Sequence, residues 1–213
     1  MLRSAGIGLC ALALTGCVGE RAGWMHQACI EASPACIASP EDAGGLMPAP
    51  ILLPGLQMVV RLENHGFDAE RVKIIGLPVS ERSVTGPSSS SRPPLTRLFL
   101  SMTSANATAT FHPEHVTLIV GDVVLHPVAS YEFGRWGPDG KPSPEGSWGF
   151  KPVSGAQTLG LSRREMSVDF GMEPPSPERG DLKLDLSEAL NMPGQAPVPL
   201  LRFVPRRWRH DHV

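Results

Sequence analysis

The sequence predicts an all-β protein, and more narrowly an antiparallel β-sandwich of the immunoglobulin-like or transthyretin-like kind with long loops rich in proline and glycine. Short stretches in which apolar and polar residues alternate recur between turn residues, and no long stretch shows the helical period of about 3.6 residues. The chain has 22 glycines and 22 prolines among 213 residues, yet 41% of its residues are hydrophobic, which is enough for one core. We expect a single folded domain, since β-sandwiches reach about 200–250 residues unsplit.

Three strands are expected in the first half of this domain. Residues 56–62 (LQMVVRL) alternate between apolar and mostly polar positions, as a strand with one buried face does. A second strand is expected over 71–77 (RVKIIGL) and a third over 95–102 (LTRLFLSM), with a break rich in serine and proline between them.

The clearest hairpin joins residues 115–120 (HVTLIV) to residues 123–128 (VVLHPV). The dipeptide between them, Gly121-Asp122, is typical of a tight turn, because glycine adopts the positive φ that such a turn requires. The β pattern then continues to Phe133. Residues 135–155 are so rich in glycine and proline that we expect a loop there.

Three later segments predict the remaining strands. Residues 165–170 (EMSVDF) and 181–187 (DLKLDLS) both alternate, the second so strictly that its leucines must face a core and its charges water. This is the one-sided pattern of antiparallel sheets. Residues 198–204 (VPLLRFV) predict a closing strand, which we expect at a sheet edge because proline has no N–H for the ladder.

Residues 1–16 have the layout of a secretory signal, since one cation, Arg3, precedes an apolar run that ends at Leu14. That run is too short to span a membrane, which takes about 20 apolar residues. Leu14-Thr15-Gly16-Cys17 resembles the signal motif of bacterial lipoproteins. The resemblance implies cleavage before Cys17 and acyl chains, palmitate among them, on its sulfur and nitrogen, and Val18 in the next position implies release to the outer membrane. The alternative is an ordinary signal peptide that leaves Cys17 free.

The chain is therefore expected to divide into a signal peptide (1–16), a lipidated tether (17–54), a β-sandwich domain (55–205) and a basic tail (206–213). The tether is polar and punctuated by prolines. It contains Cys29 and Cys36, which predict a disulfide in an oxidising compartment. Metal ligation by this pair is the alternative, although only His26 lies near as a further ligand.

Composition and motifs argue against several functional classes. The formal net charge of −2 is too weak for the basic face of a nucleic-acid-binding domain, so we expect no nucleic-acid partner. The sequence contains no G-x-S-x-G elbow, no S-x-x-K, no H-E-x-x-H and no phosphate-cradling glycine loop. We expect a protein that is not an enzyme and that has no cofactor.

The best candidates for metal ligands are His112, His115 and His126, with Glu114 beside them. Imidazoles and a carboxylate could hold zinc or copper if they converged. However, His115 and His126 lie on opposite arms of the expected hairpin and His112 precedes it, so convergence would need an unusual turn. We therefore expect a solvated sheet end without a metal; a periplasmic carrier of copper or zinc is the alternative.

Two aromatic segments are candidates for recognition. The expected loop carries Trp136, Trp148 and Phe150, which either fold back as a lid on the sandwich or contact a partner, since aromatic side chains dominate interface hot spots. The tail segment 206–209 (RRWR) joins cations to an indole. It could touch anionic head groups or a partner, or stay solvated.

Together these features predict a lipoprotein on the periplasmic face of the outer membrane that binds another envelope protein or serves as an accessory subunit of an envelope assembly. The expected architecture is similar to that of the outer-membrane lipoprotein of type VI secretion assemblies, a lipidated β-sandwich that docks onto an inner-membrane partner. An inhibitor or immunity lipoprotein against a periplasmic toxin is an alternative. The expected partners are the membrane, through the lipid, and one envelope protein.

Overall fold

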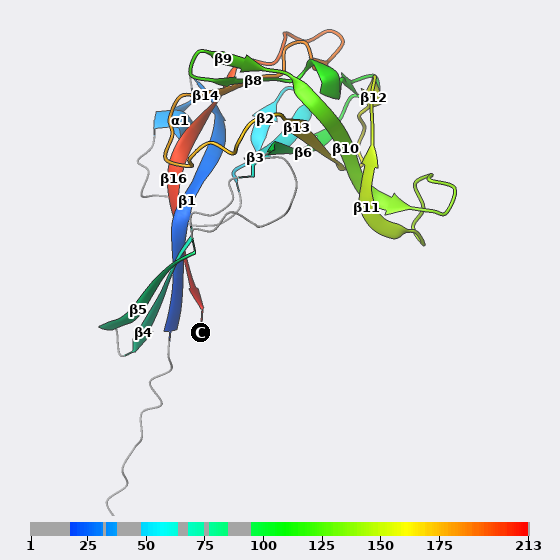
Figure 1. Cartoon of the computed structure of the whole chain (residues 1–213). Coiled ribbons are helices and arrows are strands. Elements are labelled where there is room, and N and C mark those ends of the chain that lie inside the picture. Colours follow the sequence, from blue (N-terminus) through cyan, green and yellow to red (C-terminus); the bar gives the residue numbers. More distant parts are fainter. Residues whose placement is uncertain are drawn as a thin grey trace, which may run out of the picture.

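The computed structural model describes residues 18–31, 33–37, 48–63, 68–74, 77–84 and 95–212. The expected leader and Cys17, the expected acyl acceptor, lie outside these ranges. The described chain is built almost entirely of antiparallel strands, arranged in two large sheets and one small sheet (Figure 1). The predicted all-β, sandwich-like fold is confirmed. No helix in the described ranges is long and apolar enough to cross a membrane.

Sheet A, the larger sheet, has seven strands in the order β5-β4-β1-β16-β14-β8-β9. Its two longest strands, β1 and β16, pair over almost their whole length, from Gly19 opposite His212 to Ile30 opposite Leu201. The strands are β1 (Val18–Ile30), β4 (Asp68–Ile74), β5 (Leu77–Val84), β8 (Thr117–Val120), β9 (Val123–Leu125), β14 (Leu182–Asp185) and β16 (Leu201–His212).

The hairpin predicted around Gly121-Asp122 is confirmed. β8 and β9 pair directly across the turn, with Val120 opposite Val123. Gly121 has a φ of 60°, in the left-handed region that glycine adopts without strain.

Sheet B has six strands in the order β11-β10-β13-β6-β3-β2. β3 coincides with the predicted strand over 56–62, and β6 and β13 lie within two residues of their predicted starts. The strands are β2 (Ile51–Leu53), β3 (Leu56–Leu62), β6 (Thr96–Ser104), β10 (Pro127–Trp136), β11 (Ser147–Pro152) and β13 (Arg164–Phe170).

The core lies between the inner faces of these two sheets. β14 shows the predicted alternation, because Leu182 and Leu184 are fully buried while Lys183 and Asp185 are half-buried. Burying one such leucine stabilises the fold by about 1.5–3 kcal/mol. Sheet B supplies the facing side chains, among them Met58, Val60, Leu98, Leu100, Met102, Met166, Val168 and Phe170.

A third sheet of three short strands, in the order β12-β7-β15, completes the sandwich. It places Phe111 of β7 in the core, where the ring is fully buried. A 3-10 turn, η2 (Pro113–His115), follows β7 directly. The three strands are β7 (Thr110–Phe111), β12 (Gln157–Thr158) and β15 (Leu190–Asn191).

The outer halves of β1 and β16 project from the body together with β4 and β5 (Figure 1). We call this part the stalk: Val18–Gly23 of β1, the facing residues of β16, and the β4–β5 hairpin. The strand predicted over 71–77 is therefore only partly right. Residues 71–74 belong to β4, which begins earlier, and Leu77 begins β5.

Two predicted segment boundaries are wrong because residues 18–30 and 206–212 belong to strands of sheet A. Val18–Ile30, expected in the tether, is strand β1, and the tail from Arg206 continues β16 to His212. Arg206 and Trp208 are buried, with 4% and 6% of their surface exposed. The polar composition of 18–30 concealed a strand that is stabilised by its pairing with β16.

β16 is not the edge strand that its prolines predicted, because it lies between β1 and β14. On the side of β14, Pro205 leaves the pairing intact. β14 pairs only with Leu201–Phe203, so Pro205 lies beyond the end of that ladder and its missing N–H breaks no bond there.

The predicted disulfide is confirmed, since Cys29 and Cys36 are bonded. Cys29 is buried in β1, and Cys36 lies in the short helix α1 (Pro34–Ile37). The disulfide therefore holds α1 against sheet A. His26, the only other ligand considered for a metal at this pair, instead makes a 2.7 Å hydrogen bond between its Nε2 and the carbonyl of Arg179.

Candidate functional site

The segment expected as an aromatic loop is largely a β-hairpin. β10 extends to Trp136 and β11 returns from Ser147, with Phe133 opposite Phe150 and Arg135 opposite Trp148. The prediction of a loop over 135–155 is thus wrong for 135–136 and 147–152. Its glycines and prolines lie mostly in the connection 137–146 and after Pro152.

Register places two of the three predicted contact residues on one face and the third on the other. Trp148 and Phe150 are two residues apart on β11, so both project to the outer face of sheet B. They are 64% and 48% exposed. Trp136 projects to the opposite face, where its Nε1 donates a 2.9 Å hydrogen bond to the carbonyl of Gly149. Neither Trp148 nor Phe150 is a lid over the core.

Phe133 of β10 lies between the two exposed rings. Its ring stacks on that of Trp148 with centroids 5.3 Å apart and an interplanar angle of 13°. It also meets the ring of Phe150 at 5.0 Å and 49°. These are the offset and tilted geometries that aromatic pairs favour, at about 0.5–1.5 kcal/mol per pair.

Arginines lie over the rings on the same face. The guanidinium of Arg135 is 5.2 Å from the Trp148 ring centre, and that of Arg97 is 5.8 Å from the centres of both Tyr131 and Phe150. Farther along the sheet, Arg61 lies 4.7 Å from the centre of Phe99. Each distance is within the range of a cation–π contact.

Arg97 is held in place by a buried carboxylate on the neighbouring strand β13. Its Nε and Nη2 donate hydrogen bonds of 2.6 and 2.7 Å to the two oxygens of Asp169, and only 2% of the Asp169 side chain is exposed. The hydrogen bond to Asp169 raises the pKa of Arg97 above its ordinary value. The guanidinium is therefore a permanent, oriented cation over the rings of Tyr131 and Phe150.

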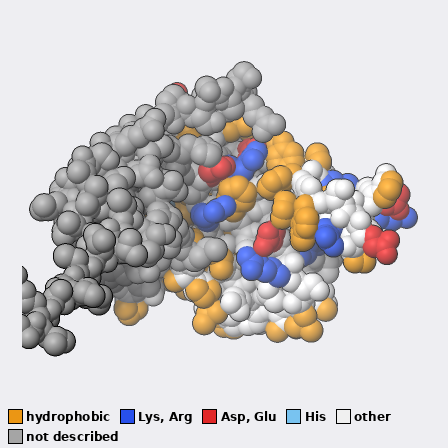
Figure 2. Space-filling model, turned by 90° about the horizontal axis from the view of Figure 1, so that it is seen from below, with side chains coloured by type: hydrophobic (Ala, Val, Ile, Leu, Met, Phe, Trp, Pro, Cys, Tyr) orange, Lys and Arg blue, Asp and Glu red, His pale blue; other side chains and the backbone are white. Residues whose placement is uncertain are grey.

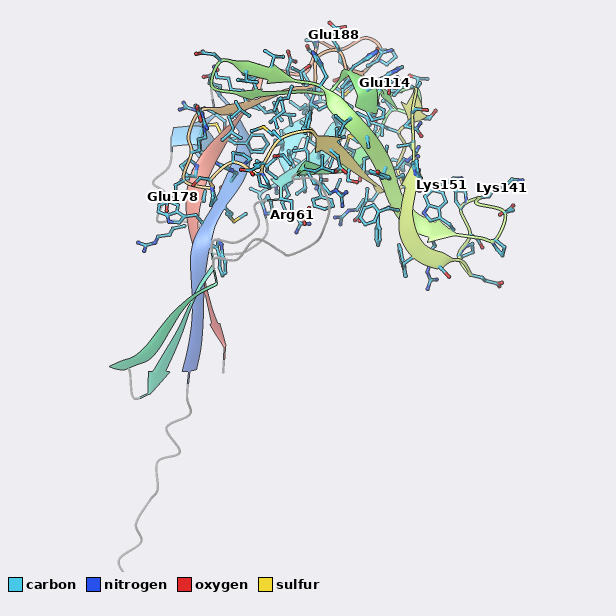
Figure 3. All side chains as sticks on the ribbon, in the orientation of Figure 1. Arg61, Glu114, Lys141, Lys151, Glu178 and Glu188 are labelled. Carbon is cyan, nitrogen blue, oxygen red and sulfur yellow. A yellow bond between two sulfur atoms is a disulfide. The ribbon has the colours of Figure 1, made fainter. Side chains whose placement is uncertain are left out.

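We define the aromatic face as the outer surface of sheet B formed by Phe99, Tyr131, Phe133, Trp148 and Phe150 with Arg61, Arg97 and Arg135. Figure 2 shows the underside of the molecule, where hydrophobic side chains are interspersed with cations and acids over the described part. Arg61 points to this side in Figure 3. The stalk projects to the same side of the body (Figure 1).

The histidine candidates come together only in part. The rings of His112 and His115 stack with centroids 5.4 Å apart, and His112 Nδ1 lies 3.7 Å from Glu114. His115 Nδ1 is 3.3 Å from the carbonyl of Glu188. His126 stands between β9 and β10. In the described ranges, which include all three histidines, no group of three or more His, Cys, Asp or Glu side chains is arranged to hold a metal.

The basic tail is built into sheet A and is not a free terminal segment. The guanidinium of Arg207 lies 5.7 Å from the ring centre of Trp24, and Trp208 is buried. Arg206 Nε donates a 3.2 Å hydrogen bond to Gln27. The indole of RRWR is therefore part of the fold, and the solvated or membrane-touching tail considered from the sequence is not what forms.

Six residues of the aromatic face were not predicted from the sequence: Phe99, Tyr131, Phe133, Arg61, Arg97 and Arg135. A signal for part of this set exists, because Tyr131 and Phe133 occupy alternate positions in the expected strand that ends at Phe133. The contribution of β3 and β6 follows only from strand order, which brings Arg61 opposite Phe99.

Comparisons with known proteins identify no relative. No family model matches the chain, no curated protein is similar to it, and no solved structure shares its fold at a significant level.

Proposed function

We propose that this chain is a lipid-anchored envelope protein that binds another protein through the aromatic face and catalyses no reaction. The observation that carries the proposal is the exposure of Trp148 and Phe150 on an ordered hairpin. Exposed apolar side chains rimmed by polar groups mark interaction sites, and Trp, Tyr and Arg dominate binding hot spots.

The face is ordered before any partner arrives. Phe133 stacks against both exposed rings, and Arg135 packs on Trp148 while its Nη1 donates a hydrogen bond to the carbonyl of Pro144. Immobilising a mobile side chain at an interface costs about 0.5–1.5 kcal/mol of conformational entropy. Side chains that are already held in place avoid most of this cost. Such an arrangement favours recognition of a protein surface.

The proposed anchor is acylation of Cys17 at the outer membrane, on the periplasmic side. Cys17 directly precedes β1, so the lipid would join the end of the stalk without a flexible spacer. The six stalk residues Val18–Gly23 span about 20 Å at ~3.3 Å per residue. Because stalk and aromatic face lie on the same side of the body, the partner would be bound on the membrane side.

Membrane fractionation tests the anchor. Cys17→Ser should move the protein from the outer-membrane fraction to the soluble periplasmic fraction, because it removes the acyl acceptor. Cys10→Ser, within the expected leader, is the matched control and should leave the protein in the membrane. Retention of the Cys17→Ser chain in the membrane would contradict lipid anchoring.

Crosslinking in native membranes, followed by purification and mass spectrometry, tests the binding function. One envelope protein should copurify with the wild-type chain in stoichiometric amount, and it should not copurify with the double variant Trp148→Ala, Phe150→Ala. Val123→Ala with Val124→Ala is the matched control, since these side chains are 57% and 56% exposed on the edge of the other sheet. A partner that the aromatic variant still captures would overturn the role of the face.

A further inference from the structure

β11 is an edge strand of sheet B, and it is longer than the edge strands β2 and β9 and more regular in its pairing than the edge strand β5. Of the strands at the ends of the two large sheets, β2 and β9 have three residues each. β5 contains Pro78, and its pairing with β4 shifts register. Short length, proline and irregular pairing all discourage further pairing. β11 has six residues, and its only proline is the last one.

The backbone groups at the open edge of β11 are those of the two exposed aromatic residues, Trp148 and Phe150. Val153 N donates a 3.0 Å hydrogen bond to Ser130 O, one position beyond the β10–β11 register. Antiparallel pairs alternate, so Lys151, Gly149 and Ser147 also direct their backbone groups to β10. The backbone N–H and C=O groups of Trp148 and Phe150 therefore point away from β10, toward the outside of the sheet.

The connecting loop does not lie along this edge. Ser143 N donates to Arg135 O at 3.0 Å, and the same alternation directs that carbonyl away from β11. The loop thus hydrogen-bonds to the far side of β10. Every residue of β11 is exposed except Gly149, which is half-buried, and a Cβ added at Gly149 would meet no atom within 4 Å.

We propose that β11 pairs antiparallel with β11 of a second copy of this chain, about a two-fold axis at Gly149. In this register Trp148 lies opposite Phe150 of the second copy, and Ser147 lies opposite Lys151. The residues whose backbone groups point outward thus face each other and can exchange both hydrogen bonds. Aromatic side chains meet aromatic side chains, no like charges are opposed, and the two-fold contact closes on itself.

Pairing at this edge joins sheet B of both copies into one continuous sheet. The two aromatic faces then lie side by side, since side chains of a sheet stand perpendicular to it. The dimer uses backbone groups at the edge, whereas the proposed partner binds the rings from the face. This inference therefore goes beyond the proposed function, and either can fail without the other.

Cysteine substitution in the full-length chain tests the register. At the two-fold axis the two Gly149 Cα atoms form a non-hydrogen-bonded pair about 4.5 Å apart, which a disulfide can bridge. The two Lys151 Cα atoms would lie about 14 Å apart, beyond the reach of a disulfide. After mild oxidation in membranes, Gly149→Cys should run as a disulfide-linked dimer on a non-reducing gel and Lys151→Cys as a monomer. No Gly149→Cys dimer, equal dimers of both variants, or a link to a different protein would each overturn the proposal.

A charge design separates strand pairing from general adhesion of the aromatics. Trp148→Lys with Phe150→Lys places lysines opposite lysines, whereas Trp148→Lys with Phe150→Glu places lysine opposite glutamate. Both variants remove the same rings. In sedimentation of the purified full chain in detergent, wild type should approach twice the monomer mass as concentration rises, the first variant should stay monomeric, and the second should recover the dimer. If both variants behave alike, the proposed register is wrong.

Discussion

Arg97 on β6 and Asp169 on β13 are joined by two hydrogen bonds across neighbouring strands, on the outer side of sheet B where Arg97 belongs to the aromatic face. The carboxylate is almost completely buried, while 24% of the Arg97 side chain is exposed. The arginine therefore has two roles: it neutralises Asp169 and presents an oriented cation to the rings of Tyr131 and Phe150.

Replacing Asp169 by asparagine should destabilise the fold strongly. Breaking a buried ion pair by removing one partner costs about 3–5 kcal/mol, because the other charge is left without compensation. Equilibrium urea unfolding measures the loss. Glu165→Gln is the control, since it breaks an exposed pair with Arg163 (3.1 Å) that is worth about 0–1 kcal/mol. Equal losses of unfolding free energy in the two variants would show that the buried pair contributes no more to stability than the exposed pair.

Trp136 and Trp148 should respond differently to substitution. Trp136→Phe removes the hydrogen bond to the carbonyl of Gly149, worth about 0.5–1.5 kcal/mol, so amide hydrogen exchange in β11 should become faster. Trp148→Phe removes no hydrogen bond and should leave that exchange near the wild-type rate. Faster exchange in the Trp148 variant alone would contradict the assignment of Trp136 as the residue that holds the hairpin.

The fold class followed from the sequence because core strands alternate visibly. β3 and β14 show apolar residues at every second position, as a strand between a core and water requires. β1 and β11 escaped prediction because their residues are polar, small or glycine-rich, and they are strands through pairing with β16 and β10. Local pattern cannot show pairing between segments 170 or more residues apart, as for Cys29 opposite Arg202.

The candidate site could be predicted only in part. Trp148 and Phe150 were found as aromatics in a segment rich in glycine and proline, but that segment was wrongly expected to be irregular. Which face each ring occupies depends on register. If the β10–β11 hairpin shifted by one residue against β13, Trp136 would project to the outer face and Trp148 to the inner face. The arginines over the rings come from β3, β6 and β10, whose order no local pattern encodes.

The disulfide should contribute to stability by about 2.5 kcal/mol in the chain-entropy model, given the separation of seven residues between Cys29 and Cys36. The free energy of unfolding of the double variant Cys29→Ser, Cys36→Ser, measured by urea titration, should be lower by this amount. Its far-UV circular dichroism spectrum should still be that of a β protein. Dithiothreitol should lower the stability of the wild type similarly and leave the variant unchanged. A reductant effect on the variant would point to a different thiol.

Arg179 should hold the pKa of Asp181 below its ordinary value of 3.8, chiefly through their side-chain hydrogen bonds. A depressed carboxyl pKa stabilises the folded state above pH 3.8, and this contribution is lost as the pH falls through the folded-state pKa. Titration of the Asp181 carboxyl carbon by NMR should show a higher pKa in Arg179→Gln. Because both groups are exposed, little change in overall stability is expected.

Site-specific photocrosslinking in living cells tests the central claim most directly. A photoreactive residue at position 148, on the aromatic face, should link the chain to one other envelope protein, whereas the same residue at position 124, on the edge of sheet A, should not. Links only to a second copy of the chain would support strand pairing alone and contradict the proposed binding function. The same foreign protein captured equally at both positions, or none at position 148, would also contradict it.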